Sequence, residues 1–459
     1  MADEMKSAGR AMRSGVSRWK LCIGAALALL LIVGGYVLVA RTRDMQRSPP
    51  RLIGNVFTAS VDGEVRVYFV TREDRSTTRP YDTEGAYTYE HSYSLYTLHA
   101  RNAADGSALA AAQIARIETT SPDFKKYQAY QTLPDGPGIL GPQGDVLWLW
   151  NNGPEARELR TLGPAWTTDS LKTRNPPFAS LLPDDPKYAK VIGALDAMIF
   201  KAKDARYFCI DRATGEFQVV DESTLAPLSP EHTKTADSAF SGLGPTGKSL
   251  RSVSVSGLIV NEVLDDGTWY ALLTPAQRES LRERLGYIEE WNLRMGSVAE
   301  TATSLFRGRY TLERERNLPR TTIRLDLASV APVGNERLLM AGFLRRPGAA
   351  GAWTIASPPG VAGSSGATSY IFLHRLTIGE KGVWSLTRIG SDGTKHWTRD
   401  TGLTELNHVC DGGTSIVITG FTPDSRPKGH WPERMIFVDE ATGALRMLNV
   451  ASGELTAGN

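Results

Sequence analysis

Two segments of this chain repeat one short hairpin pattern, and this repeat limits the fold more than any other feature of the sequence. FCIDRATGEFQVV at 208–220 and FVDEATGALRMLNV at 437–450 each place an apolar strand before Asp-x-Ala-Thr-Gly and a second strand after it. Asp at a strand end accepts hydrogen bonds from turn amides, and Gly readily adopts the positive φ of a tight turn. We therefore expect Asp211 and Asp439 to cap two such turns and not to bind a metal.

Short alternating runs separated by turn residues continue along the rest of the β-rich region, and the whole chain contains 44 glycines. Looser copies of the turn occur at 102–107 (NAADGS) and 391–394 (SDGT). Alternation of this kind predicts strands, and Asp-Gly or Thr-Gly between two strands predicts hairpins. The predicted hairpins are 56–70, 92–114, 206–220, 250–273, 383–397 and 434–450, with further strands at 145–150, 336–344, 369–376 and 414–421.

Repeated hairpins of this kind predict an all-β chain and, within that class, a β-propeller. A propeller blade takes about 40–50 residues, so residues 52–459 accommodate six to eight degenerate blades.

The hairpin unit, with Trp397 four residues after Gly393 in SDGTKHW, resembles the repeat of quinoprotein-like (PQQ-like) β-propellers. In those proteins Asp-x-x-Thr-Gly is commonly followed by Trp, and the likeness here covers about four hairpins. The whole chain also resembles a group of membrane-anchored proteobacterial proteins with a β-rich outer domain. Quinoprotein dehydrogenases add an adjacent cysteine pair, whereas Cys22, Cys209 and Cys410 stand singly. The resemblance thus implies a fold and neither oxidation chemistry nor a cofactor.

Residues 21–40 (LCIGAALALLLIVGGYVLVA) contain no charged side chain and are almost entirely apolar. As a helix they span about 30 Å, the thickness of the hydrocarbon core of a bilayer. A cleaved signal peptide is the alternative, but its apolar run is about 7–15 residues long and ends in a small-x-small site. We predict a transmembrane signal-anchor after a basic cytoplasmic tail (1–20), then a spacer (41–51).

The orientation of this helix is only weakly marked by charge. Five Lys or Arg residues precede it within 1–20 and four follow it within 41–51, a small difference for the positive-inside rule. We favour a single-pass protein of the cell inner membrane, with its C-terminal domain in the periplasm. A domain that faces the cytoplasm is the alternative.

One segment, 274–295, has a helical pattern inside the β-rich region. Thr274, Pro275 and Gln277 fit the N-cap, N1 and N3 positions of a capping box. One face of this helix carries apolar residues, namely Leu281, Leu285, Ile288 and Trp291. We expect an amphipathic helix at 275–294 that packs on the propeller, or that docks a partner.

GLGPTGKS at 242–249 has the spacing of a phosphate-binding P-loop, including Lys248. Such a loop needs a strand before it and a helix after it, so that backbone amides face the phosphates. Here the preceding residues are polar and 250–260 alternates as a strand. We therefore expect a glycine-rich surface loop that binds no nucleotide.

No other set of residues forms a catalytic or metal-binding pattern. His408 and Cys410 would share one face of a strand, but no third ligand is evident. The sequence contains no Gly-x-Ser-x-Gly motif for a serine hydrolase. Cys209 and Cys410 are expected to be buried and reduced, with a disulfide between them as the alternative.

The net charge of +2, without a basic cluster beyond the N-terminus, argues against nucleic-acid binding. The resulting hypothesis is a non-catalytic, membrane-anchored propeller that binds protein or cell-envelope partners. The alternative is an enzyme or small-molecule binder that uses the propeller channel or its top loops.

Overall fold

The chain divides into two compact units in this computed structural model. The described residues are 46–79, 89–118, 137–220, 253–255, 258–263, 267–273, 287–288, 304–314, 321–334, 338, 340–344, 353–355, 369–376, 382–423 and 434–458. The smaller unit, which we name the ribbon unit, contains the described residues 46–49, 73–79, 89–95 and 116–118. The main unit contains all the others.

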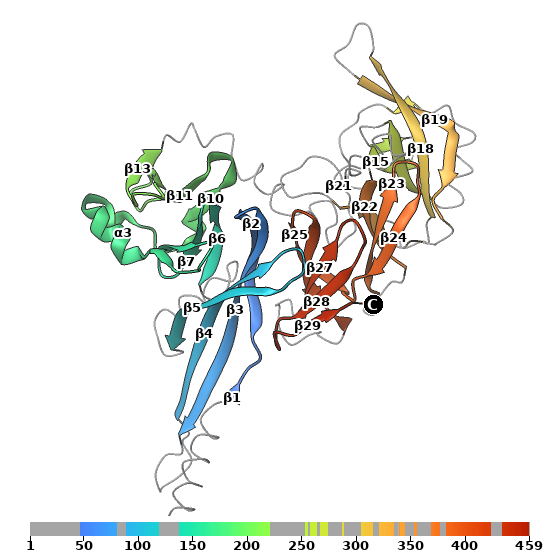
Figure 1. Cartoon of the computed structure of the whole chain (residues 1–459). Helices are drawn as coiled ribbons and strands as arrows, with labels where there is room; N and C mark the ends of the chain where they lie inside the picture. Colours follow the sequence, from blue (N-terminus) through green and yellow to red (C-terminus); the bar gives the residue numbers. More distant parts are fainter. Residues whose placement is uncertain are drawn as a thin grey trace, which may run out of the picture. The chain divides into compact units, whose positions relative to one another are not determined.

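The described chain is mostly β-strand in six antiparallel sheets, so the predicted all-β class is confirmed (Figure 1). With few exceptions, strands that follow one another in the sequence are neighbours in the same sheet. We number the sheets 1 to 6 in chain order.

The first three sheets occupy residues 46–220. Sheet 1 contains β1 (Gln46–Arg47), β2 (Arg51–Val61), β3 (Glu64–Arg79), β4 (Tyr89–Asn102) and β5 (Ala108–Glu118). Sheet 2 contains β6 (Gly138–Gln143), β7 (Val146–Trp150), β8 (Pro154–Glu158) and β9 (Pro164–Trp166). Sheet 3 contains β10 (Ala189–Ile192), β11 (Ala197–Lys201), β12 (Tyr207–Ile210) and β13 (Phe217–Val220).

The last three sheets follow the same plan. Sheet 4 contains β14 (Val253–Val255), β15 (Leu258–Val263), β16 (Thr268–Leu273), β17 (Tyr287–Ile288), β18 (Ser304–Arg314) and β19 (Thr321–Pro332). Sheet 5 contains β20 (Met340–Phe343), β21 (Thr354–Ile355), β22 (Ser369–Arg375), β23 (Trp384–Gly390) and β24 (Lys395–Asp400). Sheet 6 contains β25 (Glu405–Asp411), β26 (Ser415–Phe421), β27 (Arg434–Asp439), β28 (Leu445–Asn449) and β29 (Leu455–Ala457).

The predicted hairpins agree with these strands. Asp62-Gly63, Thr214-Gly215 and Thr442-Gly443 lie in turns between paired strands. The strand predicted at 145–150 is β7, whose five residues are all buried. Alternation and turn chemistry therefore predicted the individual hairpins well.

Among the described residues, helical structure is scarce and lies where the sequence predicted none. It consists of α3 (Thr168–Arg174) and the short 3₁₀ turns η1 (Pro176–Leu181), η2 (Pro186–Tyr188) and η3 (Gly193–Leu195). Thr167 and Ser170 form a capping box at the start of α3. The buried side chain of Asn175, just after α3, donates to Gly215 O (2.8 Å) and accepts from Phe217 N (2.8 Å). These two hydrogen bonds connect the helical segment to the turn between β12 and β13 of sheet 3.

The helix predicted at 274–295 is wrong in part. Tyr287–Ile288 form β17 and pair with Arg324 and Ile323 of β19. Gly286 disfavours a helix by about 1 kcal/mol, and the aromatic and β-branched pair that follows it fits a strand. The other residues of 274–295 lie outside the described residues.

The predicted spacer at 41–51 also contains strand structure. Gln46–Arg47 pair with Ser76 and Arg75 of β3 as β1, and β2 begins at Arg51. Pro49-Pro50 separate the two strands because proline lacks the N–H that a ladder needs. In the part of the chain that is described, no helix is long and apolar enough to cross a membrane. The predicted anchor at 21–40 lies outside that part.

In the described part of the chain, three apolar clusters each join two sheets of the main unit. Sheets 1 and 6 share a cluster that includes Phe69, Val417 and Phe437. Sheets 5 and 6 share a second, with Trp384 and Ile436, and sheets 4 and 5 share a third around Tyr270. The first and last sheets of the chain are thus packed together. A closed ring of blades stays a prediction, because residues 221–252, between sheets 3 and 4, lie outside the described chain.

Candidate functional site

Tight turns with similar hydrogen bonding lie at one end of the described sheets of the main unit. In an antiparallel meander, the first–second and third–fourth turns lie at the same end, which we name the turn end. The third–fourth turns are 102–107, 158–163, 211–216, 390–394 and 439–444. The first–second turns are 62–63, 144–145, 193–196 and 412–414.

The two matching hairpins have the turn geometry that the sequence predicted. Asp211 Oδ1 accepts from Ala213 N (2.8 Å) and Thr214 N (2.9 Å), and Gly215 has φ +71°. Asp439 Oδ1 accepts from the backbone N of the equivalent threonine (2.7 Å), and the motif glycine there has φ +70°. Both aspartates therefore cap their own turns, as predicted.

The looser copies differ from each other. At 102–107 the geometry is the same: Gly106 N donates to Asn102 O (2.8 Å), and the Asn102 side chain accepts from Ala104 N (2.8 Å). At 391–394 the turn is tighter, since Gly393 N bonds Gly390 O (2.8 Å), three residues back. A further copy, Asn449 to Gly453, was not predicted because it has Ser-Gly in place of the Asp-Gly or Thr-Gly pair that marks the other turns.

Indole rings from the preceding sheet pack on both motif glycines. A Cβ on Gly215 would lie 2.8 Å from the Trp166 ring, and one on Gly443 would lie 2.6 Å from the Trp397 ring. Trp166 Nε1 donates to Arg212 O (2.8 Å), and Trp397 Nε1 donates to a carbonyl of the equivalent turn, Glu440 O (3.2 Å). Trp166 is the final residue of β9, and Trp397 lies within β24; both strands are the last of their sheets. The glycine is needed for ring packing as well as for positive φ.

Hydroxyl groups make the same contact at three other sheet junctions. Tyr68 Oη donates to Leu159 O (2.8 Å), Tyr270 Oη to Gly390 O (3.0 Å) and Ser415 Oγ to Ala103 O (2.6 Å). Together with the two indoles, these hydroxyls make five contacts in which a donor from one sheet bonds a turn of the next sheet. The contacts run from sheet 1 to sheet 2, from 2 to 3, from 4 to 5, from 5 to 6 and from 6 to 1. We name these five contacts the turn locks.

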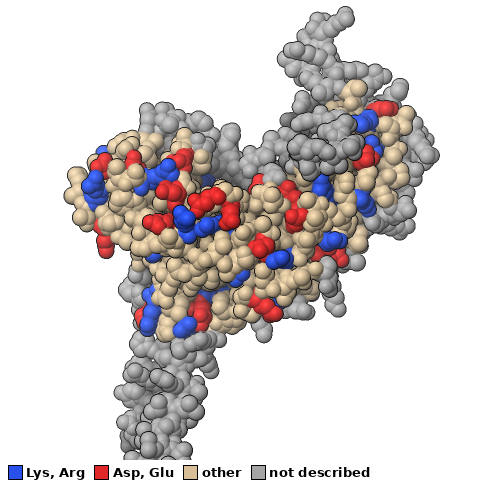
Figure 2. All heavy atoms as spheres, viewed as in Figure 1, with Lys and Arg blue, Asp and Glu red and all other residues tan. Residues whose placement is uncertain are grey.

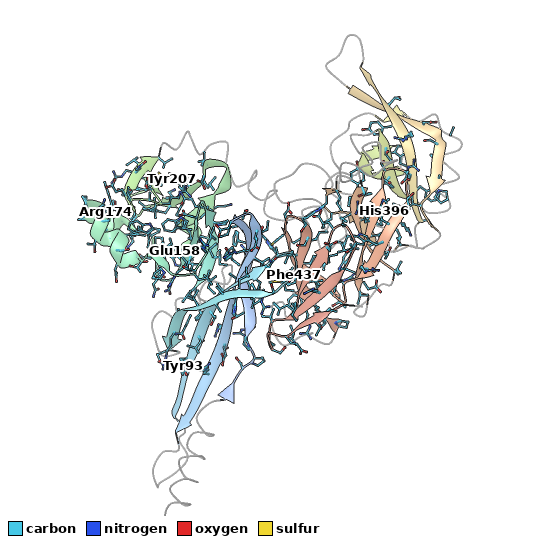
Figure 3. All side chains as sticks on the ribbon, viewed as in Figure 1. Tyr93, Glu158, Arg174, Tyr207, His396 and Phe437 are labelled. Atoms are coloured by element: carbon cyan, nitrogen blue, oxygen red, sulfur yellow. The ribbon has the colours of Figure 1, made fainter. Side chains whose placement is uncertain are left out.

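Phe437 of β27 reinforces the junction between sheets 6 and 1, since it lies against Gly106 (Figure 3). At each of these five junctions, a donor from one sheet thus holds a turn of the next sheet.

Charged side chains also cross between neighbouring turns. Arg160 lies 3.4 Å from Asp62, and Arg212 lies 3.3 Å from Asp145. These pairs are exposed and contribute little to stability.

Hydrogen bonds from turn amides lower the pKa of Asp211, so this carboxylate stays ionised at neutral pH. Basic and acidic side chains are interspersed on the face drawn in Figure 2.

The first strands of four sheets run beside one another: β25 contacts β2, β2 contacts β6 and β6 contacts β10. The strand register is interrupted in β2 between Ile53 and Phe57, in β6 after Ile139, and in β25 around Asn407. Such bulges redirect side chains and often lie beside binding sites. Asn55 and Asn407, both exposed, lie in two of these interruptions.

The histidines and cysteines of the earlier expectations do not come together. His408 is half-buried on β25, and the thiol of Cys410 is buried and donates to Val56 O (3.4 Å). Cys209 and Cys410 are both free, but only Cys410 is buried as predicted; Cys209 is half-buried. Among the described residues no three His, Cys, Asp or Glu side chains are placed to hold a metal. The P-loop-like segment 242–249 lies outside the described chain.

Two buried histidines have local structural roles. His374 Nε2 bonds Thr387 Oγ1 (2.8 Å), and His99 Nε2 bonds Thr71 Oγ1 (2.8 Å) while its ring stacks on Phe69. Burial, with a smaller contribution from Arg101, lowers the pKa of His99 to about 4. His99 is therefore neutral at pH 7.

Searches of protein-family models and of curated proteins find no match to this chain. The turn end and the bulged first strands therefore rest on the geometry of this chain alone.

Proposed function

We propose that this protein is a membrane-anchored, six-bladed β-propeller that binds a protein or another cell-envelope partner through its turn end, and that it is not an enzyme. Residues 21–40 would anchor it in the inner membrane, with the β domain in the periplasm. The observation that carries the proposal is the set of turn locks. They hold successive exposed turns on a rigid scaffold, an arrangement by which many folds present binding loops.

Three features support a closed ring of six blades. Each sheet is a meander of about four strands, as in a propeller blade. The turn locks follow one cyclic order that passes from the last sheet to the first. Sheet 3 also has a face that is only partly covered, with the apolar residues Ile192, Ala197, Tyr207 and Cys209 half-buried. Sheet 4 would cover this face when the ring is closed, in agreement with the resemblance to quinoprotein-like propellers.

Photo-cross-linking in living cells tests partner binding. A benzophenone amino acid would replace Ala213, which is exposed at the turn end of sheet 3. The matched control is Ala205, also exposed, in the 202–206 turn at the opposite end of the same sheet. We expect a discrete adduct with one partner from position 213 and none from position 205. Equal adduct patterns at both positions, or no adduct at 213, would contradict binding through the turn end.

A second candidate, small-molecule binding, is favoured by the bulged first strands. Asn55 and Asn407 are exposed where the strand register breaks. A ligand that binds there should raise the melting temperature of the wild-type protein but not that of the Asn55→Ala/Asn407→Ala variant. An equal rise in both proteins would exclude this site for that ligand.

A further inference from the structure

The ribbon unit fixes how the chain enters its first sheet. Ser48 N donates to Asp74 O (2.9 Å), and Ser48 Oγ accepts from Asp74 N (2.8 Å). Ser94 Oγ in turn donates to the Asp74 carboxylate (2.7 Å). With the pairing of β1 to β3, these bonds hold residues 46–48 against β3 within the ribbon unit.

A tyrosine between two arginines occupies the other face of the strands. Tyr93 hydrogen-bonds Arg75, and the Arg116 guanidinium lies 4.0 Å from the centre of the Tyr93 ring (Figure 3). Glu73 and Glu118 pair with these arginines at 2.9 Å and 3.0 Å. The Arg116 side chain is 54% exposed, so its guanidinium can still contact a further anion.

The length of chain before β1 places this face close to the predicted membrane helix. Five residues, 41–45, separate Ala40 from Gln46, and a fully extended chain of that length reaches only about 20 Å. Residues 41–51 carry four arginines and one aspartate. The connection is therefore both short and basic.

We propose that the Tyr93–Arg75–Arg116 face of the ribbon unit lies on the membrane surface and binds anionic phospholipid headgroups. This inference rests on the anchor at 21–40 that the proposed function includes. Tyrosine is enriched at membrane–water interfaces because its ring is apolar and its hydroxyl is polar. Arginine binds phosphate through several N–H donors, and basic segments next to a membrane helix are attracted to anionic leaflets.

The test uses the full-length protein in nanodiscs that contain a photoactivatable phospholipid, with the reactive group on the headgroup. One set contains phosphatidylglycerol and the other only phosphatidylcholine. Peptide mapping should find lipid adducts on 89–95 and 116–118. The Arg75→Gln/Arg116→Gln variant should reduce this labelling several-fold in phosphatidylglycerol and little in phosphatidylcholine. Arg174→Gln, an equally exposed arginine on α3, is the control and should leave labelling unchanged.

The possible failures are distinguishable. If the protein does not co-purify with nanodiscs, the anchor of the proposed function fails. If it co-purifies but the ribbon unit is labelled no more than α3, the membrane-surface inference is overturned and the anchor stands. If the double variant does not fold, the Tyr93→Phe variant, which keeps the ring and removes the hydroxyl, replaces it in the labelling test. Its labelling should fall relative to wild type, and unchanged labelling would count against a role for the hydroxyl.

Discussion

At the residue scale, the glycine of the repeated turn has two separable roles. Gly443 and Gly453 have nearly the same φ, +70° and +72°. A Cβ at 443 would meet the Trp397 ring at 2.6 Å, whereas nothing lies within 4 Å of a Cβ at 453. The pair therefore separates backbone conformation from ring packing.

We expect Gly453→Ala to lower the free energy of unfolding by about 1 kcal/mol, the cost of positive φ for a residue with a Cβ. Gly443→Ala should cost about 3 kcal/mol, because the indole must also move. Gly215→Ala should resemble Gly443→Ala, since Trp166 occupies the equivalent place. Urea unfolding followed by circular dichroism measures all three. Equal losses at 443 and 453 would show that the indole contact contributes nothing.

The lowered pKa of Asp211 predicts that the free energy of unfolding falls at acid pH. Turn amides lower its folded pKa below the unfolded value, so its stabilisation is present above about pH 4 and is lost as the pH falls through the folded pKa. Asp211→Asn should flatten the acid limb of the stability curve while costing little at pH 7, because Asn retains an acceptor. Unfolding midpoints between pH 5 and pH 2.5 test this. Parallel curves for the two proteins would contradict the role of the charge.

His99 should add a second loss of stability in acid, which begins at a higher pH than that of Asp211. Its folded pKa of about 4 lies below the usual 6.5, so protonation favours the unfolded chain. Stability should therefore fall as the pH drops from about 6.5 toward 4, by on the order of 2–3 kcal/mol at most. His99→Gln should remove this loss. A variant with the same pH dependence as wild type would show that another group titrates.

At the element scale, each turn is held by a donor from the neighbouring sheet. Trp166 and Trp397 use an indole N–H, and Tyr68 and Tyr270 use a hydroxyl, yet all four donate to turn carbonyls. A buried carbonyl that loses its donor costs about 1–3 kcal/mol. The turn locks are therefore expected to stabilise the junctions between sheets rather than the sheets themselves.

Tyr68→Phe tests one lock with a minimal change. It removes the hydroxyl that donates to Leu159 O and keeps the buried ring. We expect a loss of about 1–2 kcal/mol, with faster amide exchange at 158–163. Tyr188→Phe is the control, since Tyr188 is 45% exposed, and should change stability by less than about 0.5 kcal/mol. A Tyr68→Phe protein as stable as the control would remove this lock from the account.

The elements also show what the sequence could and could not predict. Alternation and turn residues predicted the hairpins because both signals are local, and Asp211 bonds amides only two and three residues away. The residue on which the Trp397 ring packs was not predictable, because that residue, Gly443, lies 46 residues further along the chain. The periodicity at 274–295 predicted a helix, but pairing with β19 placed Ile288 in a strand. Long-range contacts decided these outcomes.

At the scale of the whole molecule, the turn locks follow a cyclic order of sheets. Sheet 6 is locked to sheet 1 through Ser415, although these segments are far apart in the sequence. The junction between sheets 3 and 4 is the step that would complete the ring. Cys209 reports on it because the side chain lies on the partly covered face of sheet 3.

The most direct measurement is pulsed maleimide labelling of the native full-length protein, read for each cysteine peptide by mass spectrometry. Cys410, which is buried, is the protected reference, and urea-unfolded protein gives the rate of full exposure. Rates are compared over a pH series, because burial raises the pKa of both thiols. A closed ring predicts that Cys209 is protected to nearly the same degree as Cys410. If Cys209 instead reacts close to the unfolded rate while Cys410 stays protected, sheet 4 does not cover sheet 3 and the ring is open.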